Sequence, residues 1–380
     1  MNLLFHMITY LDCNATTPIE PEVARAIEQY IVKDFGNPGS RTHEYGAIAK
    51  SAIENARNQV ASVVNANKND VVFTSGATES NNLALIGLKD YLVANKKSVV
   101  SSKIEHKAII EPLAYLESQG VEVTYLTPSQ DGIITTESLK ESLSDNVGLV
   151  SLMHVNNETG AIQPIQEYAD VLSAHSCYFH VDAAQGFGKN LPPLRSSRID
   201  LISCSGHKIY GPKGIGALII RQRNYKRPPL KPILFGGGQE KGLRPGTLPT
   251  HQIVGLGLAS ELAEKNAARR NQKCEQIKHE AIAAFDMLTP NYICKENSIS
   301  NTLSISIPFV NSEAAIVALK GLAAVSNGSA CTSSSYSHSH VLKAMNLDDN
   351  IIEGALRFSW CHMTEEIKWK EIVATISRLI

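Results

Sequence analysis

Two residues of this 380-residue chain combine a reactive side chain with a local sequence that would leave it accessible. The first is Lys208, which follows an apolar strand and Ser205-Gly206-His207 and precedes a glycine-rich turn. A lysine held in a tight, poorly solvated loop has a lowered pKa, so its neutral amine can form a Schiff base. Lys213 lies in the same loop, and spacing alone does not choose between the two. An unreactive surface lysine is the commoner alternative for any single lysine.

The second is Cys331, which lies among small polar residues between Ser326 and Ser334. This composition indicates an accessible segment in which a thiolate can form and move, although an exposed, unreactive thiol fits the residues equally well. Cys177 and Cys204 lie in apolar strands and are interpreted as buried, inert thiols. The seven cysteines include no CxxC pair, so we predict neither a disulfide framework nor a metal site.

Two further patterns could bind an anion and a ring nitrogen. Ser75-Gly76-Ala77-Thr78-Glu79 follows a strand and opens a helix, so backbone N–H groups and the Thr78 hydroxyl can meet a phosphate. An ordinary helix cap is the alternative. Asp182 ends a buried strand, which is where open α/β sheets place their ligands. Its carboxylate can pair with the protonated pyridine nitrogen of pyridoxal phosphate, or it can cap the next helix.

Alternating apolar strands and helices must position these residues between about 50 and 255. This alternation predicts βαβ units and a mostly parallel sheet. The expected strands lie at 71–73, 98–102, 121–126, 149–154, 178–182, 201–204 and 216–220, with a helix through 82–88 after the first.

The pattern changes after Gly255, which predicts a second domain. One long helix is expected at 256–285, followed by a strand at 301–307 and a helix at 312–322. We therefore predict a large domain of residues 18–255. Residues 1–17 and 256–380 would form a smaller domain that carries Cys331.

Composition indicates an ordinary soluble globular protein, with 43% hydrophobic and 19% charged residues. The 36 basic residues nearly balance the 37 acidic ones, so no basic field is available to hold nucleic acid directly. No apolar run approaches the roughly 18–20 residues of a membrane span, and residues 1–10 do not resemble a signal peptide. We therefore expect a cytoplasmic protein whose partners are small molecules or other proteins.

Motifs along nearly the whole chain occur in the order found in one known family. They lie at 10–18, 35–40, 73–82, 105–108, 153–160, 205–214, 236–240, 244–247, 328–333 and 356–359. In these motifs the chain resembles the cysteine desulfurases that serve iron–sulfur cluster assembly and nitrogenase maturation. Those enzymes are fold-type I pyridoxal-phosphate enzymes of aminotransferase class V. The resemblance implies a large α/β domain with a mostly parallel sheet and a smaller C-terminal α/β domain.

The resemblance also implies roles for single residues. Lys208, rather than Lys213, matches the lysine that holds pyridoxal 5'-phosphate, and Cys331 matches the cysteine that receives sulfur. His106 matches the histidine that stacks on the ring and moves protons. Arg357 matches the arginine that binds the substrate carboxylate, which suits a bidentate fork.

The remaining matches concern the cofactor and a second subunit. Thr247 matches a threonine that reaches the phosphate from the other subunit, which implies a homodimer. Asn157 is also expected to contact the substrate. The other implied cofactor positions are Ala77, Thr78, Ser205 and His207 at the phosphate, Asp182 at the pyridine nitrogen, and Asn157 and Gln185 at the ring.

The implied activity converts L-cysteine to L-alanine, with the sulfur carried as a persulfide on Cys331 to an acceptor protein. A selenocysteine lyase, another class V enzyme and a non-catalytic docking platform are the alternatives. Cys331 argues against an aminotransferase, and the presence of Lys208, Asp182 and His106 argues against a platform. The chain ends at Ile380, before the tail with which longer relatives dock a scaffold protein. A role in DNA phosphorothioation, reached through protein partners, is therefore a further hypothesis beside iron–sulfur assembly.

Overall fold

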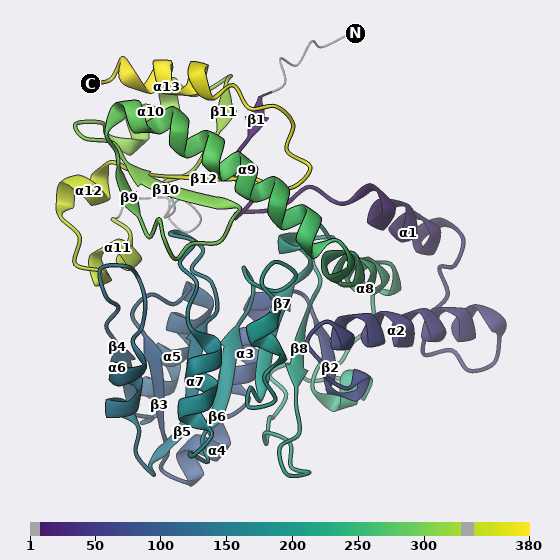
Figure 1. Cartoon of the computed structure of the whole chain (residues 1–380). Helices are drawn as coiled ribbons and strands as arrows, with labels where there is room; N and C mark the ends of the chain where they lie inside the picture. The colour runs from purple at the N-terminus through teal and green to yellow at the C-terminus, as the bar shows by residue number, and fades with distance from the viewer. Residues whose placement is uncertain (1–7, 328–337) are drawn as a thin grey trace.

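The largest sheet contains seven strands within the part of the chain that the structure describes. A computed structural model describes residues 8–327 and 338–380. The strands follow the order β2-β8-β7-β6-β5-β3-β4, and β8 is antiparallel to both neighbours while the other pairs are parallel (Figure 1). This confirms the predicted α/β fold with a mostly parallel sheet. The strands are β2 Val71–Thr74, β3 Ser98–Ser102, β4 Val123–Leu126, β5 Val147–Met153, β6 Tyr178–Asp182, β7 Leu201–Ser205 and β8 Gly216–Ile220.

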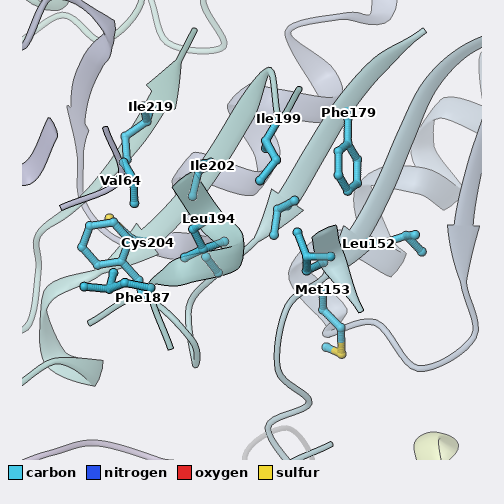
Figure 2. Packing of buried hydrophobic residues seen from close by; sticks show 14 of the residues in the cluster. Val64, Leu152, Met153, Phe179, Phe187, Leu194, Ile199, Ile202, Cys204 and Ile219 are labelled. Atoms are coloured by element: carbon cyan, nitrogen blue, oxygen red, sulfur yellow. The ribbon is translucent and has the colours of Figure 1, made fainter. Parts of the chain in front are cut away.

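Helices cover both faces of this sheet, so its central strands are apolar on both sides. Along β7, Ile202 and Cys204 belong to one hydrophobic cluster and Leu201 to another, as the period-two alternation of a strand requires. Figure 2 shows part of the first cluster, where Ile202 and Cys204 lie near Phe187 and Leu194. The helices of this part are α1 Pro21–Val32, α2 Glu44–Ser62, α3 Ala77–Ile86, α4 Lys89–Ala94, α5 Lys107–Ser118, α6 Thr136–Ser142, α7 Ile165–Leu172 and α8 Thr250–Lys265.

A second, antiparallel sheet has the strand order β12-β10-β9 and carries its own hydrophobic cluster. Near it, β1 pairs in parallel with β11, so the start of the described chain lies beside a late segment (Figure 1). The elements here are β1 Thr9–Tyr10, α9 Ala267–Phe285, β9 Asn291–Ile293, β10 Thr302–Ser306, α10 Ser312–Ala318, β11 Ala323–Ala324, α11 His340–Ala344, α12 Asp349–Glu353, β12 Ala355–Ser359 and α13 Trp369–Ser377. Short 3-10 helices occur at η1 Lys68–Asp70, η2 Pro192–Arg195, η3 Gly206–Lys208, η4 Gln239–Gly242 and η5 Asp286–Leu288.

The single long helix predicted at 256–285 is wrong, because two helices, α8 and α9, occupy this region. They meet at Asn266, whose backbone (φ −103°, ψ 9°) leaves the helical conformation. The Asn266 side chain donates to the carbonyl of Leu262, and such local bonds favour helix ends over helix interiors. The helix predicted at 312–322 is also shorter than expected, since α10 ends at Ala318.

The division into two domains stays a prediction, and the separate hydrophobic clusters support it. Leu256 and Leu262 of α8 pack in a cluster of the large sheet, whereas Cys274 and Phe285 of α9 pack against the small sheet. Within the described ranges, no helix has the length and apolar character needed to cross a membrane.

Candidate active site

A cavity of about 500 Å³ lies at the carboxyl ends of the parallel strands. Met153, Asp182 and Ser205 are the last residues of β5, β6 and β7, and all three line it. Arg357 of the small sheet lines it as well, together with the segment from Asn14 to Thr16. The cavity therefore lies where open α/β sheets place ligands, with the small sheet supplying another wall. The sequence-predicted residues that line it are Ala77, Thr78, His106, Asn157, Asp182, Gln185, Ser205, His207, Lys208 and Arg357.

The start of α3 lines this cavity and presents groups that can bind an anion. Gly76 is the N-cap residue, and the first N–H groups of a helix have no partner within the helix. The Ser205 Oγ lies 3.6 Å from the position that a Cβ would occupy at Gly76. Gly216 in β8 allows this turn to approach, because a Cβ at residue 216 would lie 2.6 Å from Gly76 Cα.

Asp182 is buried at the floor of the cavity and is held by two donors. Its Oδ2 accepts from Asn81 Nδ2 at 2.7 Å and its Oδ1 from the Ala184 backbone at 2.9 Å. The Asn81 Oδ1 has no hydrogen-bond partner among the described residues. The carboxylate is therefore fixed in direction and available to a cationic N–H from the cavity side.

Lys208 directs its amine toward the backbone of the N-terminal segment. Its Nζ donates to the carbonyl of Asn14 and to that of Ala15, the latter at 2.9 Å. Lys213 lines the same cavity, but it is exposed, whereas Lys208 is half-buried. Because Lys208 is the less exposed of the two and its amine is held by two carbonyls, the geometry favours Lys208 as the reactive lysine.

Two histidines in the cavity wall are kept neutral by burial. Burial lowers the pKa of His106, with the Asp182 carboxylate acting in the opposite direction. The His106 Nδ1 accepts from the Ala108 backbone at 3.0 Å, so the neutral ring carries its proton on Nε2. Burial, and then the nearby Lys208 charge, lower the pKa of His207 to about 4.

Arg357 lies in β12 and is almost fully buried, with 2% of its surface exposed. Its Nη1 donates to the Asn157 carbonyl at 2.7 Å, and its Nη2 donates to Asp12 Oδ1 at 2.6 Å. A buried guanidinium in a cavity wall can bind a carboxylate through charge-assisted hydrogen bonds.

Two predicted residues do not join this group. Thr247 lines a separate cavity of about 510 Å³, together with Arg41 and His43. Its role across a subunit boundary therefore stays a prediction. Cys331 lies outside the described residues.

Sequence reasoning missed Asn14 and Asn81. Asn14 is buried, and its carbonyl accepts from Lys208 and from Gln185 Nε2. Its side chain bonds Thr302, which joins the N-terminal segment to β10. Asn81 could have been found from its place one turn after Ala77, since a polar residue on a buried helix face needs a partner.

The groups in the cavity fit pyridoxal phosphate. The start of α3 with Ser205 and Thr78 suits the phosphate, the Asp182 carboxylate suits a protonated ring nitrogen, and Lys208 supplies an amine.

Comparisons with known proteins agree with this arrangement. The family model described as aminotransferase class-V matches residues 9–368. The cysteine desulfurase IscS of Shewanella sp. (strain W3-18-1) is 44% identical over 375 residues, which cover 98% of this chain and 92% of the relative.

Solved structures show the same similarity in three dimensions. A NifS-like protein superposes with a TM-score of 0.89 at 32% identity, and the match covers 98% of both chains. DndA from Streptomyces lividans superposes with a TM-score of 0.82 at 44% identity, covering 93% of this chain and 99% of that one.

Proposed function

The chain belongs to the class V aminotransferase family and is a pyridoxal-phosphate-dependent cysteine desulfurase, and we propose that it carries the sulfur of L-cysteine on Cys331. The observation that carries this proposal is the meeting of Lys208, Asp182 and Arg357 in one cavity. They offer an amine, a carboxylate and a guanidinium, which match the aldehyde and ring nitrogen of the cofactor and the carboxylate of the amino acid.

When bound, pyridoxal phosphate supplies an electron sink that permits removal of a proton from the α-carbon of the substrate. Asp182, held by Asn81, would pair with the ring nitrogen and favour its protonated form. Lys208 would hold the cofactor through its amine. The neutral His106 and Lys208 move protons at the α-carbon, because burial keeps the imidazole uncharged near neutral pH.

Arg357 fixes the substrate carboxylate and also connects the substrate to the segment that contains Cys331. The backbone of Arg357 pairs with Ser326, donating to the Ser326 carbonyl at 2.6 Å. Only a few residues separate Ser326 from Cys331, and each spans at most about 3.6 Å. A cysteine tethered this close to the carboxylate site has the reach to meet the substrate sulfur.

The transfer step is an attack by the Cys331 thiolate on the sulfur of the bound substrate. A sulfur–sulfur bond forms while the carbon–sulfur bond breaks. The electron pair of the broken bond stays with the carbon, which becomes the methyl group of alanine after protonation. Cys331 is left as a persulfide that an acceptor protein can attack in turn.

We further propose that the enzyme is a cytoplasmic homodimer that hands sulfur to an acceptor protein. The position of Thr247 in a second cavity, away from the chain's own Ser205 and Lys208, supports a role across two subunits. The IscS relative and DndA are both 44% identical to the chain, so similarity does not choose the acceptor. Affinity capture with the persulfide form as bait would separate an iron–sulfur scaffold from a DNA-phosphorothioation partner.

The variant C331S tests the sulfur-carrying role. It should keep the absorbance of the bound cofactor and the spectral response to L-cysteine, yet release no sulfide in the presence of a thiol reductant. C177A, which removes a buried thiol outside the cavity, is the matched control and should retain sulfide release. Sulfide release by C331S at the wild-type rate would refute the proposal.

A further inference from the structure

Asp12 holds one edge of the guanidinium of Arg357. The Nη2–Oδ1 distance is 2.6 Å, and 22% of the Asp12 side chain is exposed against 2% for Arg357. The Asn157 carbonyl accepts a hydrogen bond from Nη1 at 2.7 Å. The Arg357 Nε–H has no hydrogen-bond partner among the described residues, and Arg357 lines the cavity. Two of the three nitrogens are therefore held by the protein, and the third is a buried N–H without a partner among the described residues.

We propose that Asp12 is a positioning residue, which orients the guanidinium of Arg357 in the cavity wall so that it meets the substrate carboxylate. This inference rests on the proposed function, in which Arg357 binds that carboxylate. A carboxylate supplies two acceptors and matches the planar fork of a guanidinium, so binding depends on how that fork is oriented.

The backbones of both residues are fixed, which gives the ion pair a defined geometry. Asp12 forms a parallel bridge with Ser359 of β12. Arg357 lies between Ser304 of β10 and Ser326, with which it forms a further bridge. The short Asp12 side chain therefore holds Nη2 from a fixed backbone position, and the long Arg357 side chain loses rotational freedom.

Asp12 also balances the charge of a guanidinium that is almost removed from water. Removing one partner of a buried pair leaves the other charge uncompensated, and the remaining group then seeks new partners. Without Asp12, Arg357 would turn toward other acceptors, such as the Asn157 carbonyl that it already contacts. The expected effect is a loss of carboxylate recognition without a loss of amine recognition.

Two ligands separate these effects in the holoenzyme. L-alanine carries an amine and a carboxylate, and ethylamine carries the amine alone. Each is titrated against the absorbance of the bound cofactor. For the variant D12A we expect the dissociation constant of L-alanine to rise about tenfold or more, as loss of a charge-assisted contact implies, while that of ethylamine stays unchanged. D12N keeps an acceptor oxygen for Nη2 and should recover part of the loss.

The variant R357A shows which step of the argument fails. It should raise the dissociation constant of L-alanine at least as much as D12A does. Adding D12A to R357A should raise it no further. If R357A leaves L-alanine binding unchanged, the assignment of Arg357 in the proposed function is wrong. If R357A weakens L-alanine but D12A does not, or if D12A weakens both ligands equally, only the role of Asp12 is overturned.

If D12A does not retain the cofactor, the variant D12E decides the question. Glutamate keeps the negative charge but is longer by one methylene, so it shifts the guanidinium. The same selective loss of L-alanine affinity is expected, and wild-type affinity for L-alanine would overturn the proposal.

Discussion

Glu105 is a fully buried carboxyl group directly before His106. Its Oε1 accepts from Ser102 Oγ at 2.6 Å and from the Met153 backbone at 3.1 Å, and its Oε2 has no partner among the described residues. Burial raises the pKa of Glu105 to about 8. The group is therefore protonated at neutral pH, and its backbone carbonyl accepts from His340 at 2.9 Å.

The raised pKa of Glu105 predicts a specific dependence of stability on pH. Between the ordinary carboxyl pKa of about 4.3 and about 8, the folded protein keeps a proton that the unfolded chain releases, so stability falls as pH rises through this window. Between pH 5 and pH 9, wild type should lose a few kcal/mol of unfolding free energy relative to E105Q. Each tenfold difference in proton affinity between the folded and unfolded states corresponds to about 1.4 kcal/mol. Denaturant unfolding at pH 5 and pH 9 measures this.

The exposed Glu111 on α5 provides the matched control for loss of one negative charge. If the free energies of unfolding of E105Q and wild type differ by the same amount at pH 5 and pH 9, burial of the Glu105 carboxyl has no such effect. The same conclusion follows if E111Q departs from wild type between these pH values as strongly as E105Q does.

The lowered pKa of His106 predicts how the rate of alanine release changes at acid pH. Burial disfavours the imidazolium and lowers the pKa of His106, so the neutral ring should persist to a pH below the usual histidine value of about 6.5. H106N keeps an acceptor for the Ala108 backbone at the start of α5, since asparagine is a good N-cap. We expect H106N to lower kcat about 100-fold and to remove this acid limb from alanine release. An unchanged limb would exclude His106 as the titrating group.

Single side chains of the site could be predicted from residue type, whereas backbone contributions could not. Lys208, Asp182 and Thr78 have functional groups whose chemistry is visible in the sequence. Asn14 acts through its carbonyl, which every residue type carries, so nothing in its identity predicts that it meets Lys208. The pairing of Asp12 with Arg357 likewise depends on a contact between the first and last parts of the fold.

At the scale of elements, η4 is attached to the edge of the large sheet by one buried ion pair. Glu240 accepts from Arg57 of α2 through both of its oxygens, at 2.6 and 2.8 Å. It also accepts from the backbone of Phe73, in the edge strand β2, at 2.7 Å. The carboxylate thus satisfies an edge N–H that would otherwise be unpaired, and it fixes the loop that continues to Thr247.

Removing the buried Arg57–Glu240 pair should lower the free energy of unfolding much more than removing the more exposed Arg57–Glu54 pair. We expect E240A to lower the free energy of unfolding by about 3–5 kcal/mol, because it leaves the Arg57 charge buried without its main partner. E54A removes an exposed partner of the same arginine and should cost less than about 1 kcal/mol. Thermal or denaturant unfolding of both variants measures the difference, and equal losses would contradict the assignment.

Most strands could be placed from the sequence, and the helix ends could not. β3, β6 and β8 coincide with the predicted ranges because short apolar runs with turn residues at both ends leave little choice. Apolar residues recur at short intervals in both α8 and α9, so the sequence pattern alone predicts one helix. The break comes from a side-chain bond that competes locally with the helix.

At the scale of the whole molecule, an apolar surface adjoins the cavity that contains Thr247. Ile31 and Val32 of α1 are 55% and 63% exposed, and Phe35 and Tyr45, whose ring centroids lie 5.6 Å apart, are exposed as well. Asn37 and Pro38, close behind Phe35 in the chain, line the second cavity. Large exposed apolar groups that lie together are typical of protein interfaces, which agrees with the proposed homodimer.

A charge placed in this surface should separate the subunits. F35E is expected to convert the proposed dimer to a monomer. It should also weaken cofactor binding, because the proposed contact of Thr247 with the partner's phosphate site would be lost. V93E changes an exposed valine in α4 and should leave the dimer intact. Analytical ultracentrifugation with cofactor titration measures both. A dimeric F35E, or a V93E that dissociates, would contradict the position of the interface.

The position of the transferred sulfur tests the central claim most directly. The holoenzyme is treated with a limiting amount of L-cysteine, alkylated, digested and analysed by mass spectrometry. We predict one additional sulfur atom on the peptide that contains Cys331, with none on the other cysteine peptides, and an equivalent amount of free alanine. Alanine formation with the additional sulfur on a different cysteine, or with none on Cys331, would contradict the account.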